Sequence, residues 1–491
     1  MNDASQENFR ELPPVNEIMT FSAIAPLIDE RGRECVRDWV RAAVADLRER
    51  IAKATLNGSC SRRQLTGLAV QFVYERAEAE SSEKLGNVIN ATGVVLHTSL
   101  GRAPLCEAAI AAVREAASAL NLEVDLATGE RRYRGYQLQS AWRRLTGAEA
   151  ALVVNNNAAA TVLALEGLCR GREVVISRGQ LIEIGGSFRL PEVFAQSGAV
   201  LREVGTTNRT RLADYESAIG PATAALLRVH PSNYRVEGFA ETPEIDELSA
   251  LAHRYGLTCL DDIGSGCLVE TVRFGLPQEP TFQQSLAAGA DLVLGSGDKL
   301  LGGPQCGIML GRAELIERLS AHPLARSFRI DKLTLAALSA TLDVYLRGEA
   351  DREIPTLALL AASRDELLAR ARKIHADLAL GRDCAATGVR DTSLDNGNLQ
   401  DAAGTLRIEV ATDQALVGGG SLPGASLPTA VLRLSHPRMT VDVLARRMRL
   451  GSPRVFGRIQ ENALVLDLRS VLPADDERIA AAIRSQIANS H

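Results

Sequence analysis

Short runs of β-branched and aliphatic residues alternate with helical segments from Val88 to about residue 345. The candidate strands are Ala151–Val154, Glu173–Ile176, Val200–Val204, Ala224–Val229, Leu257–Asp261 and Leu292–Leu294. They are apolar almost throughout, and Ala-rich and Leu-rich segments such as Ala158–Cys169 lie between them. Both features are typical of a parallel sheet that helices cover on its two faces. The pattern predicts a large doubly wound α/β domain over residues 86–345, with ligands at the carboxyl ends of its strands.

Residues 1–85 are expected to form a helical N-terminal domain. A run without Pro or Gly extends from Arg33 to Asn57, and its apolar residues recur at helical spacing. From Arg31 to Lys53 there are seven basic and four acidic residues, whereas residues 1–65 contain ten of each. A charge run of this size is normally a solvated helix face, so it does not alone predict a nucleic-acid site.

Residues 346–491 predict a smaller C-terminal α+β domain. The expected elements are a helical segment over Thr356–Leu380, strands at Thr405–Val410, Ala430–Ser435 and Leu464–Asp467, and a last helix near Asp476–Ala488. The glycine-rich segment Gly418–Pro428 is too short and too apolar for a flexible linker, so we expect a loop inside this domain.

Composition excludes several classes of protein. The chain has 491 residues, 46 % hydrophobic and 23 % charged, which suits a soluble protein of two or three domains. Its apolar stretches are shorter than the roughly 18 residues of a membrane span, and its polar start predicts no secretory signal. The formal net charge of −5 excludes a global polycation. The eight cysteines form no CxxC pair, so we expect no disulfide or metal site and a reduced, cytoplasmic setting.

Lysine is scarce in this chain, since only five of the 55 basic residues are lysines. One of them, Lys299, lies in the glycine-rich run from Gly295 to Gly303. Most lysines are solvated surface charges. A primary amine can nevertheless form an imine, whereas a guanidinium stays protonated, and nearby glycines let the backbone approach a flat ring. The run lacks the spacing of a nucleotide-binding loop. Lys299 is therefore the candidate nucleophile.

Polar groups also follow three other predicted strands. The first strand runs into Asn155, Asn156, Asn157 and Ala158, where side-chain amides and the free amides of a helix start would bind a phosphate. Plain helix capping is the alternative explanation of this segment.

Another predicted strand ends in the carboxylate pair Asp261–Asp262, followed by Ser265. A third leads to His230 and Asn233. A phosphate cradle, an aspartate and a lysine, each at a strand end, are the layout of a fold-type I pyridoxal 5′-phosphate enzyme. In such enzymes the aspartate keeps the pyridine nitrogen protonated, which makes the ring an electron sink. Asp262 is preferred over Asp261 because Asp-Ile-Gly resembles the usual Asp-x-small pattern, although either could point inward.

Longer motifs carry a family resemblance along most of the chain. They are VINATGVVLHTSLGRAP (88–104), TGAEAALVVNNNAAA (146–160), SRGQLIEIGGSFRLP (177–191), EVGTTNRT (203–210), VHPSNYRVEGF (229–239), GSGDKLLGGPQCGI (295–308) and HPLARSFRIDKLTLAAL (322–338). Together they resemble the bacterial selenocysteine synthase family, the L-seryl-tRNA(Sec) selenium transferases. The resemblance implies a pyridoxal phosphate-dependent transferase of fold type I.

The resemblance also implies a reaction. Seryl-tRNA(Sec) would be converted to selenocysteinyl-tRNA(Sec) by β-elimination of the serine hydroxyl and addition of selenium from selenophosphate, with Lys299 carrying protons. It implies a homo-oligomer, a ring of dimers forming a decamer, whose N-terminal domain binds the tRNA. Arg102, Arg134 and Arg326 are the candidates for holding the selenium donor or the tRNA end, because guanidinium groups match phosphate geometry.

The sequence departs from the family pattern in two places. Ser99 stands where the entry motif usually has Asn, and the segment Arg132–Gly135 replaces a usual Gly-Ser-Arg, which could shift the role of Arg134 to Arg132. Near the cofactor ring, Gln180 or Glu183 is expected in place of a stacking aromatic residue.

Two other functions fit parts of the pattern. A fold-type I lyase acting on a small phosphorylated amino acid would share Lys299 and Asp262, although it would have less need of a helical N-terminal domain. A catalytically dead tRNA-binding scaffold is the other alternative, and the intact Lys299 and Asp262 argue against it.

Overall fold

The chain forms two compact units, Met1–Asn87 and Val88–His491, in the computed structural model. The structure describes residues 3–56, 58–83, 85–184, 188–383, 398–400 and 406–488. Within these ranges no helix combines the length and the apolar character needed to cross a membrane.

The first unit is helical, as predicted. Its helices are α1 (Asp3–Arg10), α2 (Val15–Met19), α3 (Ala25–Arg31), α4 (Arg33–Ala52) and α5 (Arg62–Glu83). The residues of α4 that recur at helical spacing in the sequence, such as Val36, Val40 and Leu47, are the ones that it buries. The unit therefore has its own hydrophobic core, to which α2, α3 and α5 also contribute.

A seven-stranded sheet forms the centre of the second unit, with the strand order β3-β11-β10-β9-β8-β4-β7. The strands are β3 (Ala150–Val154), β4 (Glu173–Ser177), β7 (Val200–Val204), β8 (Thr223–Val229), β9 (Thr258–Gly264), β10 (Leu292–Ser296) and β11 (Gly307–Gly311). All six strands predicted for this domain are present. Strand β11 was not predicted; it runs antiparallel to both of its neighbours, β10 and β3.

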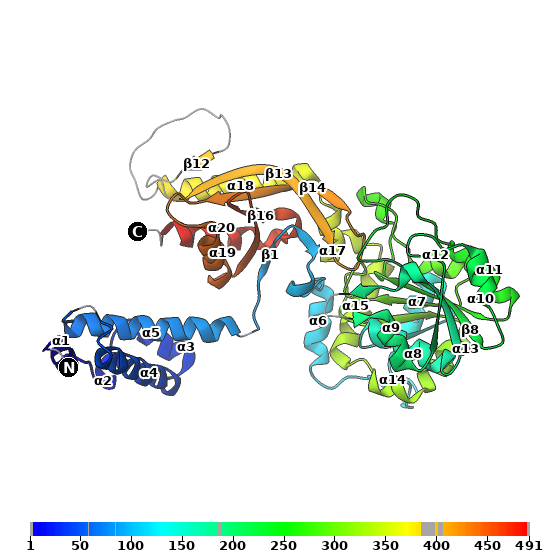
Figure 1. Ribbon diagram of the computed structural model, residues 1–491, viewed down its shortest axis with the longest axis horizontal. Helices are drawn as coiled ribbons and strands as arrows, with labels where there is room; N and C mark the ends of the chain where they lie inside the picture. Colours follow the sequence, from blue (N-terminus) through cyan, green and yellow to red (C-terminus); the bar gives the residue numbers. More distant parts are fainter. Residues whose placement is uncertain are drawn as a thin grey trace. The chain divides into compact units, whose positions relative to one another are not determined.

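Helices cover both faces of this sheet, as the doubly wound prediction requires (Figure 1). One core cluster contains residues of α6 (Glu107–Ala116), α7 (Gln139–Thr146), α10 (Leu212–Ala218), α11 (Ile245–Arg254), α12 (Phe282–Ala287) and α15 (Lys332–Leu346). The other contains residues of α8 (Asn157–Cys169), α9 (Leu190–Ser197) and α13 (Ala313–Ala321). Successive strand residues alternate between the clusters: Val293 belongs to the first, and Leu292 and Leu294 belong to the second. This alternation requires strands that are apolar throughout.

A second sheet has the order β1-β15-β16-β14-β13-β12, with β2 also paired to β13. Its strands are β1 (Ile89–Ala91), β2 (Val94–Leu96), β12 (Asn398–Gln400), β13 (Arg407–Gly418), β14 (Ser426–Ser435), β15 (Val455–Gln460) and β16 (Ala463–Asp467), and α18 (Arg364–Asp383), α19 (Val441–Leu450) and α20 (Asp476–Ala488) accompany them. The sheet and its helices share one core cluster, so this region is the predicted α+β part.

The boundaries differ from the prediction in three respects. Strands β1 and β2 lie in the range predicted for the large domain but pair with β15 and β13 of the second sheet. The predicted helix over 356–380 is two helices, α17 (Pro355–Ala361) and α18, because Ser363 and Glu366 exchange hydrogen bonds that start a new helix. The loop predicted over 418–428 ends earlier, since β14 begins at Ser426. Thr405, the predicted start of a strand, lies outside the described residues.

Candidate active site

A cavity of about 220 Å³ lies at the carboxyl ends of β3, β9 and β10. Its lining includes Asn156, Asn157 and Ala158 after β3, Asp262 and Gly264 of β9, and Ser296, Asp298 and Lys299 at and after β10. The three segments that the sequence predicted to meet at one sheet edge therefore line a single cavity.

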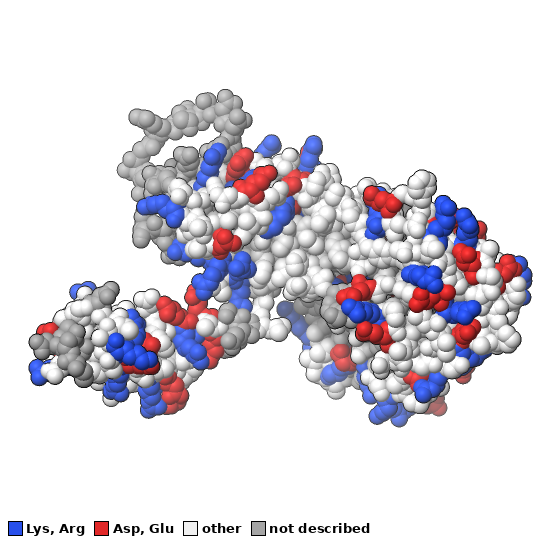
Figure 2. Space-filling view, viewed as in Figure 1, with Lys and Arg blue, Asp and Glu red and all other residues white. Residues whose placement is uncertain are grey.

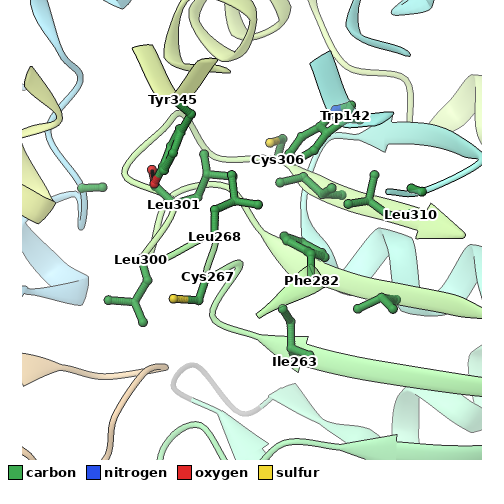
Figure 3. Packing of buried hydrophobic residues seen from close by; sticks show 14 of the residues in the cluster. Trp142, Ile263, Cys267, Leu268, Phe282, Leu300, Leu301, Cys306, Leu310 and Tyr345 are labelled. Atoms are coloured by element: carbon green, nitrogen blue, oxygen red, sulfur yellow. Dashed lines mark hydrogen bonds between the residues drawn. The ribbon is translucent and has the colours of Figure 1, made fainter. Parts of the chain in front are cut away.

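Lys299 follows β10 and is only 5 % exposed. The next two residues, Leu300 and Leu301, are fully buried in the core, and the Tyr345 hydroxyl donates to the Leu301 carbonyl at 2.8 Å (Figure 3). This packing fixes the backbone that carries the lysine. Burial lowers the pKa of Lys299, and the nearby Asp262 carboxylate opposes this shift. The amine is therefore easier to deprotonate than that of a solvated lysine.

The two neighbouring aspartates of β9 point to opposite faces of the sheet, as successive strand residues must. Asp261 is fully buried and accepts two hydrogen bonds from Arg228, from Nε at 2.8 Å and Nη2 at 2.7 Å. Asp262 faces the cavity and accepts from Asn157 Nδ2 at 2.9 Å and Thr161 Oγ1 at 3.2 Å. Burial raises the pKa of Asp262, although the Asn157 hydrogen bond and the Lys299 charge lower it in part. Of the two aspartates, Asp262 is therefore the one that faces the cavity.

Helix α8 begins at the cavity. Asn156 caps it by accepting from the Ala159 amide at 2.9 Å, and Ala158 lines the cavity within its first turn. The first amides of a helix have no intrahelical acceptor and attract anions. Asn155 lies outside the lining. It is exposed, and its backbone N–H donates to the Phe328 carbonyl. Of the residues predicted to form the phosphate cradle, Asn156, Asn157 and Ala158 therefore line the cavity and Asn155 does not.

Of the other predicted cofactor-binding residues, only His230 lines the cavity. Its Nε2 lies 3.4 Å from Oε2 of the buried Glu279. Ser265 is buried below Lys299, where its carbonyl accepts from the Leu300 amide, and it is not part of the lining. Asn233 is exposed, and its side-chain Nδ2 donates to the backbone carbonyl of Glu183 at 2.7 Å.

The three predicted arginines lie in different places. Arg102 lines the cavity and donates to Asp298 Oδ2 at 2.8 Å. Arg134 lies outside the lining, where it donates to Glu123 Oε1 at 3.1 Å and to the Ile330 carbonyl at 2.8 Å. Arg326 is exposed on the short helix α14 (Pro323–Ser327). Of these three arginines, Arg102 is the one that lines the cavity.

The residues named as alternatives are also outside the lining. Arg132 pairs with Asp125 at 3.5 Å. Gln180 accepts from the Val229 amide, and the exposed Glu183 pairs with Arg189. The hydrophobic side of the cavity is made by Ile182, Leu190 and Val229 instead.

Gly420, in the loop between β13 and β14, was not among the residues predicted for the site. A β-carbon on this residue would lie 2.8 Å from Cε and 2.9 Å from Nζ of Lys299. Its φ of +89° is also in the region that favours glycine. Gly420 therefore lets the loop of the second sheet lie directly against the lysine, and no local sequence signal predicted this contact.

We expect Gly420→Ala to displace the Lys299 amine and to weaken cofactor binding and turnover by at least about tenfold. The new β-carbon would lie 2.8 Å from Lys299 Cε, so the lysine must move, and the left-handed backbone at residue 420 is strained for alanine. Gly424→Ala is the matched control: it lies in the same loop with a φ of +72°, but its β-carbon would meet open space. Cofactor titration of both variants, followed by the visible absorption, measures the difference. Equal affinities would show that the contact with Lys299 is unimportant.

The residues of this cavity fit pyridoxal phosphate. A buried amine and a buried carboxylate face one space, the start of a 13-residue helix offers free amides, and the buried Asn157 Oδ1 has no hydrogen-bond partner among the described residues. These are the donor set, the counter-charge and the anion site that a phosphorylated pyridine aldehyde requires.

Fold and site together define a pyridoxal phosphate-dependent enzyme of fold type I. The family model for L-seryl-tRNA selenium transferase matches residues 88–472, and that for the selenocysteine synthase N terminal matches residues 9–48. The chain belongs to the L-seryl-tRNA selenium transferase family, which confirms the resemblance predicted from the sequence.

Two curated relatives illustrate the match. The L-seryl-tRNA(Sec) selenium transferase of Solidesulfovibrio magneticus is 45 % identical over 98 % of both chains. That of Hyphomonas neptunium is 43 % identical over 97 % of this chain and 98 % of its own. Among solved structures, D-glucosaminate-6-phosphate ammonia-lyase has a TM-score of 0.55 at 21 % identity, covering 84 % of this chain and 97 % of that one, which supports the fold alone.

Proposed function

We propose that Lys299, Asp262 and the start of α8 form the cofactor site with which this chain converts seryl-tRNA(Sec) to selenocysteinyl-tRNA(Sec), with selenophosphate as the selenium donor. The observation that carries the proposal is the shared cavity of a buried lysine and a buried aspartate in a chain of this family. The same observation argues against a catalytically dead scaffold.

The residues divide the chemistry between them. When bound, pyridoxal phosphate supplies an electron sink for charge that develops at the α-carbon of the seryl group. Asp262 would hold a proton on the pyridine nitrogen. Asn157 and Thr161 keep the Asp262 carboxylate in place by donating hydrogen bonds to it. Lys299 binds the cofactor through its amine and then removes the α-proton, for which its lowered pKa suits it. The first amides of α8 hold the phosphate.

Arg102 is the proposed contact for the selenium donor. Arg102 lines the cavity, and its Nη1 donates to Asp298. Its Nε has no hydrogen-bond partner among the described residues. A guanidinium with a free donor can bind a phosphate-like group. We assign no such role to Arg134 and Arg326 within one subunit, since neither lines the cavity. In a ring of dimers, the proposed homo-oligomer, they could serve a neighbouring site.

We further propose that residues 1–87 bind the tRNA and that the protein works in the cytoplasm, where charged tRNAs are used. Figure 2 shows basic and acidic side chains interspersed on the face in view, and several basic residues of α4 pair with acidic residues three or four positions away. Binding must then depend on particular exposed groups such as Arg33 and Arg48, and on several subunits acting together.

Deletion of residues 1–87 is expected to lower the affinity for seryl-tRNA(Sec) by about two orders of magnitude, or ~2.7 kcal/mol. The cofactor absorption should persist, because Val88–His491 is a compact unit that contains the whole cavity. Filter binding at several salt concentrations measures the change. Retained tRNA affinity in the deletion variant would contradict the role of the N-terminal unit.

Selenium transfer is tested by incubating the holoenzyme with seryl-tRNA(Sec) and radiolabelled selenophosphate, and following the label into RNA. Seryl-tRNA(Ser) is the control for tRNA selection. Release of ammonia from O-phosphoserine without any labelling of tRNA would instead establish the small-molecule lyase.

A further inference from the structure

A second and larger pocket of about 620 Å³ adjoins the cofactor cavity. The two hollows share Val229 and His230 in their linings, so the end of β8 separates them. The larger pocket therefore lies next to the cavity that Lys299 lines.

The charges around this pocket do not favour a small anion. Three arginines and three glutamates line it, and each arginine has a carboxylate partner. The pairs are Arg209–Glu241 at 3.1 Å, Arg228–Asp261 at 2.7 Å and Arg235–Glu237 at 3.1 Å. A balanced set of paired charges suits a ligand portion that is neutral overall.

Flat apolar surfaces form much of the remaining lining. Tyr234 donates its hydroxyl to the Gly179 carbonyl, which fixes the position of its ring. Proline rings at positions 231, 243, 277, 280 and 423 also line the pocket. A fixed aromatic ring is a platform on which a nucleobase can stack.

Two buried polar side chains in the lining offer groups that can hydrogen-bond to a ligand. Gln180 is 5 % exposed, and its Oε1 accepts from the Val229 amide, so its side-chain Nε2 is the donor of this pair. Glu279 is 1 % exposed, and its Oε1 has no hydrogen-bond partner among the described residues. A donor and an acceptor beside a stacking platform are the groups that read the edge of a base. A buried polar atom is normally satisfied, so Glu279 Oε1 marks a position suited to a donor of a ligand.

We propose that this pocket binds the 3′-terminal nucleoside of the seryl-tRNA, so that the attached seryl group passes His230 and enters the cofactor cavity. The inference rests on the proposed function and adds the substrate portion that it must accommodate. Because the seryl group is esterified to the terminal ribose, that ribose has to lie within one amino acid's length of Lys299. The adjoining pocket meets this requirement, and its neutral lining suits a nucleoside better than the selenium donor.

The test uses 3′-deoxy-3′-(L-serylamino)adenosine, an uncleavable analogue of the charged end, and L-serinamide, which lacks the nucleoside. Calorimetric titration of the holoenzyme should show tighter binding of the adenosine compound. Val236→Trp, at a pocket-lining residue that is 39 % exposed, should remove that advantage and weaken the analogue at least about tenfold. Val443→Trp is the control, since Val443 is 44 % exposed on α19 and lines none of these pockets.

A second variant tests the hydrogen bonds without filling the pocket. Gln180→Glu keeps an acceptor for the Val229 amide and replaces the side-chain donor by a carboxylate oxygen, so it should weaken the analogue while leaving L-serinamide and the cofactor absorption unchanged. The proposal is overturned if the nucleoside adds no affinity in the parent, if Val236→Trp binds the analogue as the parent does, or if inorganic phosphate displaces the analogue. If the parent fails to label seryl-tRNA(Sec) with selenium, the proposed function itself fails.

Discussion

Lys299→Ala is expected to lower selenium transfer by at least about 10³-fold, because no other described lysine lines the cavity. The variant should still fold, since the side chain lies at the edge of a cavity and its neighbours Leu300 and Leu301 supply the local packing. The visible absorption of the bound cofactor should disappear with the activity. The loss reflects two roles, holding the cofactor and moving the α-proton.

Mass spectrometry after borohydride reduction locates the attachment. The parent should carry the pyridoxyl mass on the peptide that contains residue 299, and Lys299→Ala should carry none. Lys373→Ala, at an exposed lysine of α18, is the matched control and should keep both the mass and the activity. A pyridoxyl mass on any other lysine of the parent would remove the basis of the proposed site.

The central sheet and the cofactor segments were predictable because both leave local signals. Continuous apolar runs mark buried parallel strands, and a polar residue at the end of such a run or within three residues after it lies near the carboxyl edge. Lys299, Asp262 and Asn157 satisfy this rule. Strand β11 left a weaker signal, since it has glycine at both ends, and β1 and β2 have only three residues each.

Partner choice across the fold was not predictable. Arg134 and Asn233 were predicted as ligand-binding residues together with Arg102 and His230, yet their side chains bind Glu123 and a backbone carbonyl outside the cavity. Gly420 belongs to the other sheet and reaches Lys299 only through tertiary packing. Motif context identifies which residues to consider, and the path of the backbone decides which of them meet.

The neighbouring aspartates of β9 offer the sharpest separation of catalysis from stability. Asp262→Asn should keep the shape of the side chain and still accept a hydrogen bond, but it cannot hold a proton on the pyridine nitrogen. We expect selenium transfer to fall by about a hundredfold or more. The folded protein should not be weakened, because burial raises the pKa of Asp262 and the ionised carboxylate therefore costs stability above the pKa of the unfolded chain.

Asp261→Asn should have the opposite effect. The side chain of Arg228 is 13 % exposed, and the fully buried Asp261 carboxylate accepts two hydrogen bonds from it. The substitution removes this negative charge and leaves the buried Arg228 cation uncompensated. We expect the free energy of unfolding to fall by about 3 kcal/mol, with cofactor absorption and turnover retained in the folded fraction. Denaturant unfolding of both apo variants, together with turnover of both holoenzymes, measures the two effects. If Asp261→Asn lost turnover while Asp262→Asn kept it, the carboxylate that faces the cofactor would have been assigned to the wrong side of the sheet.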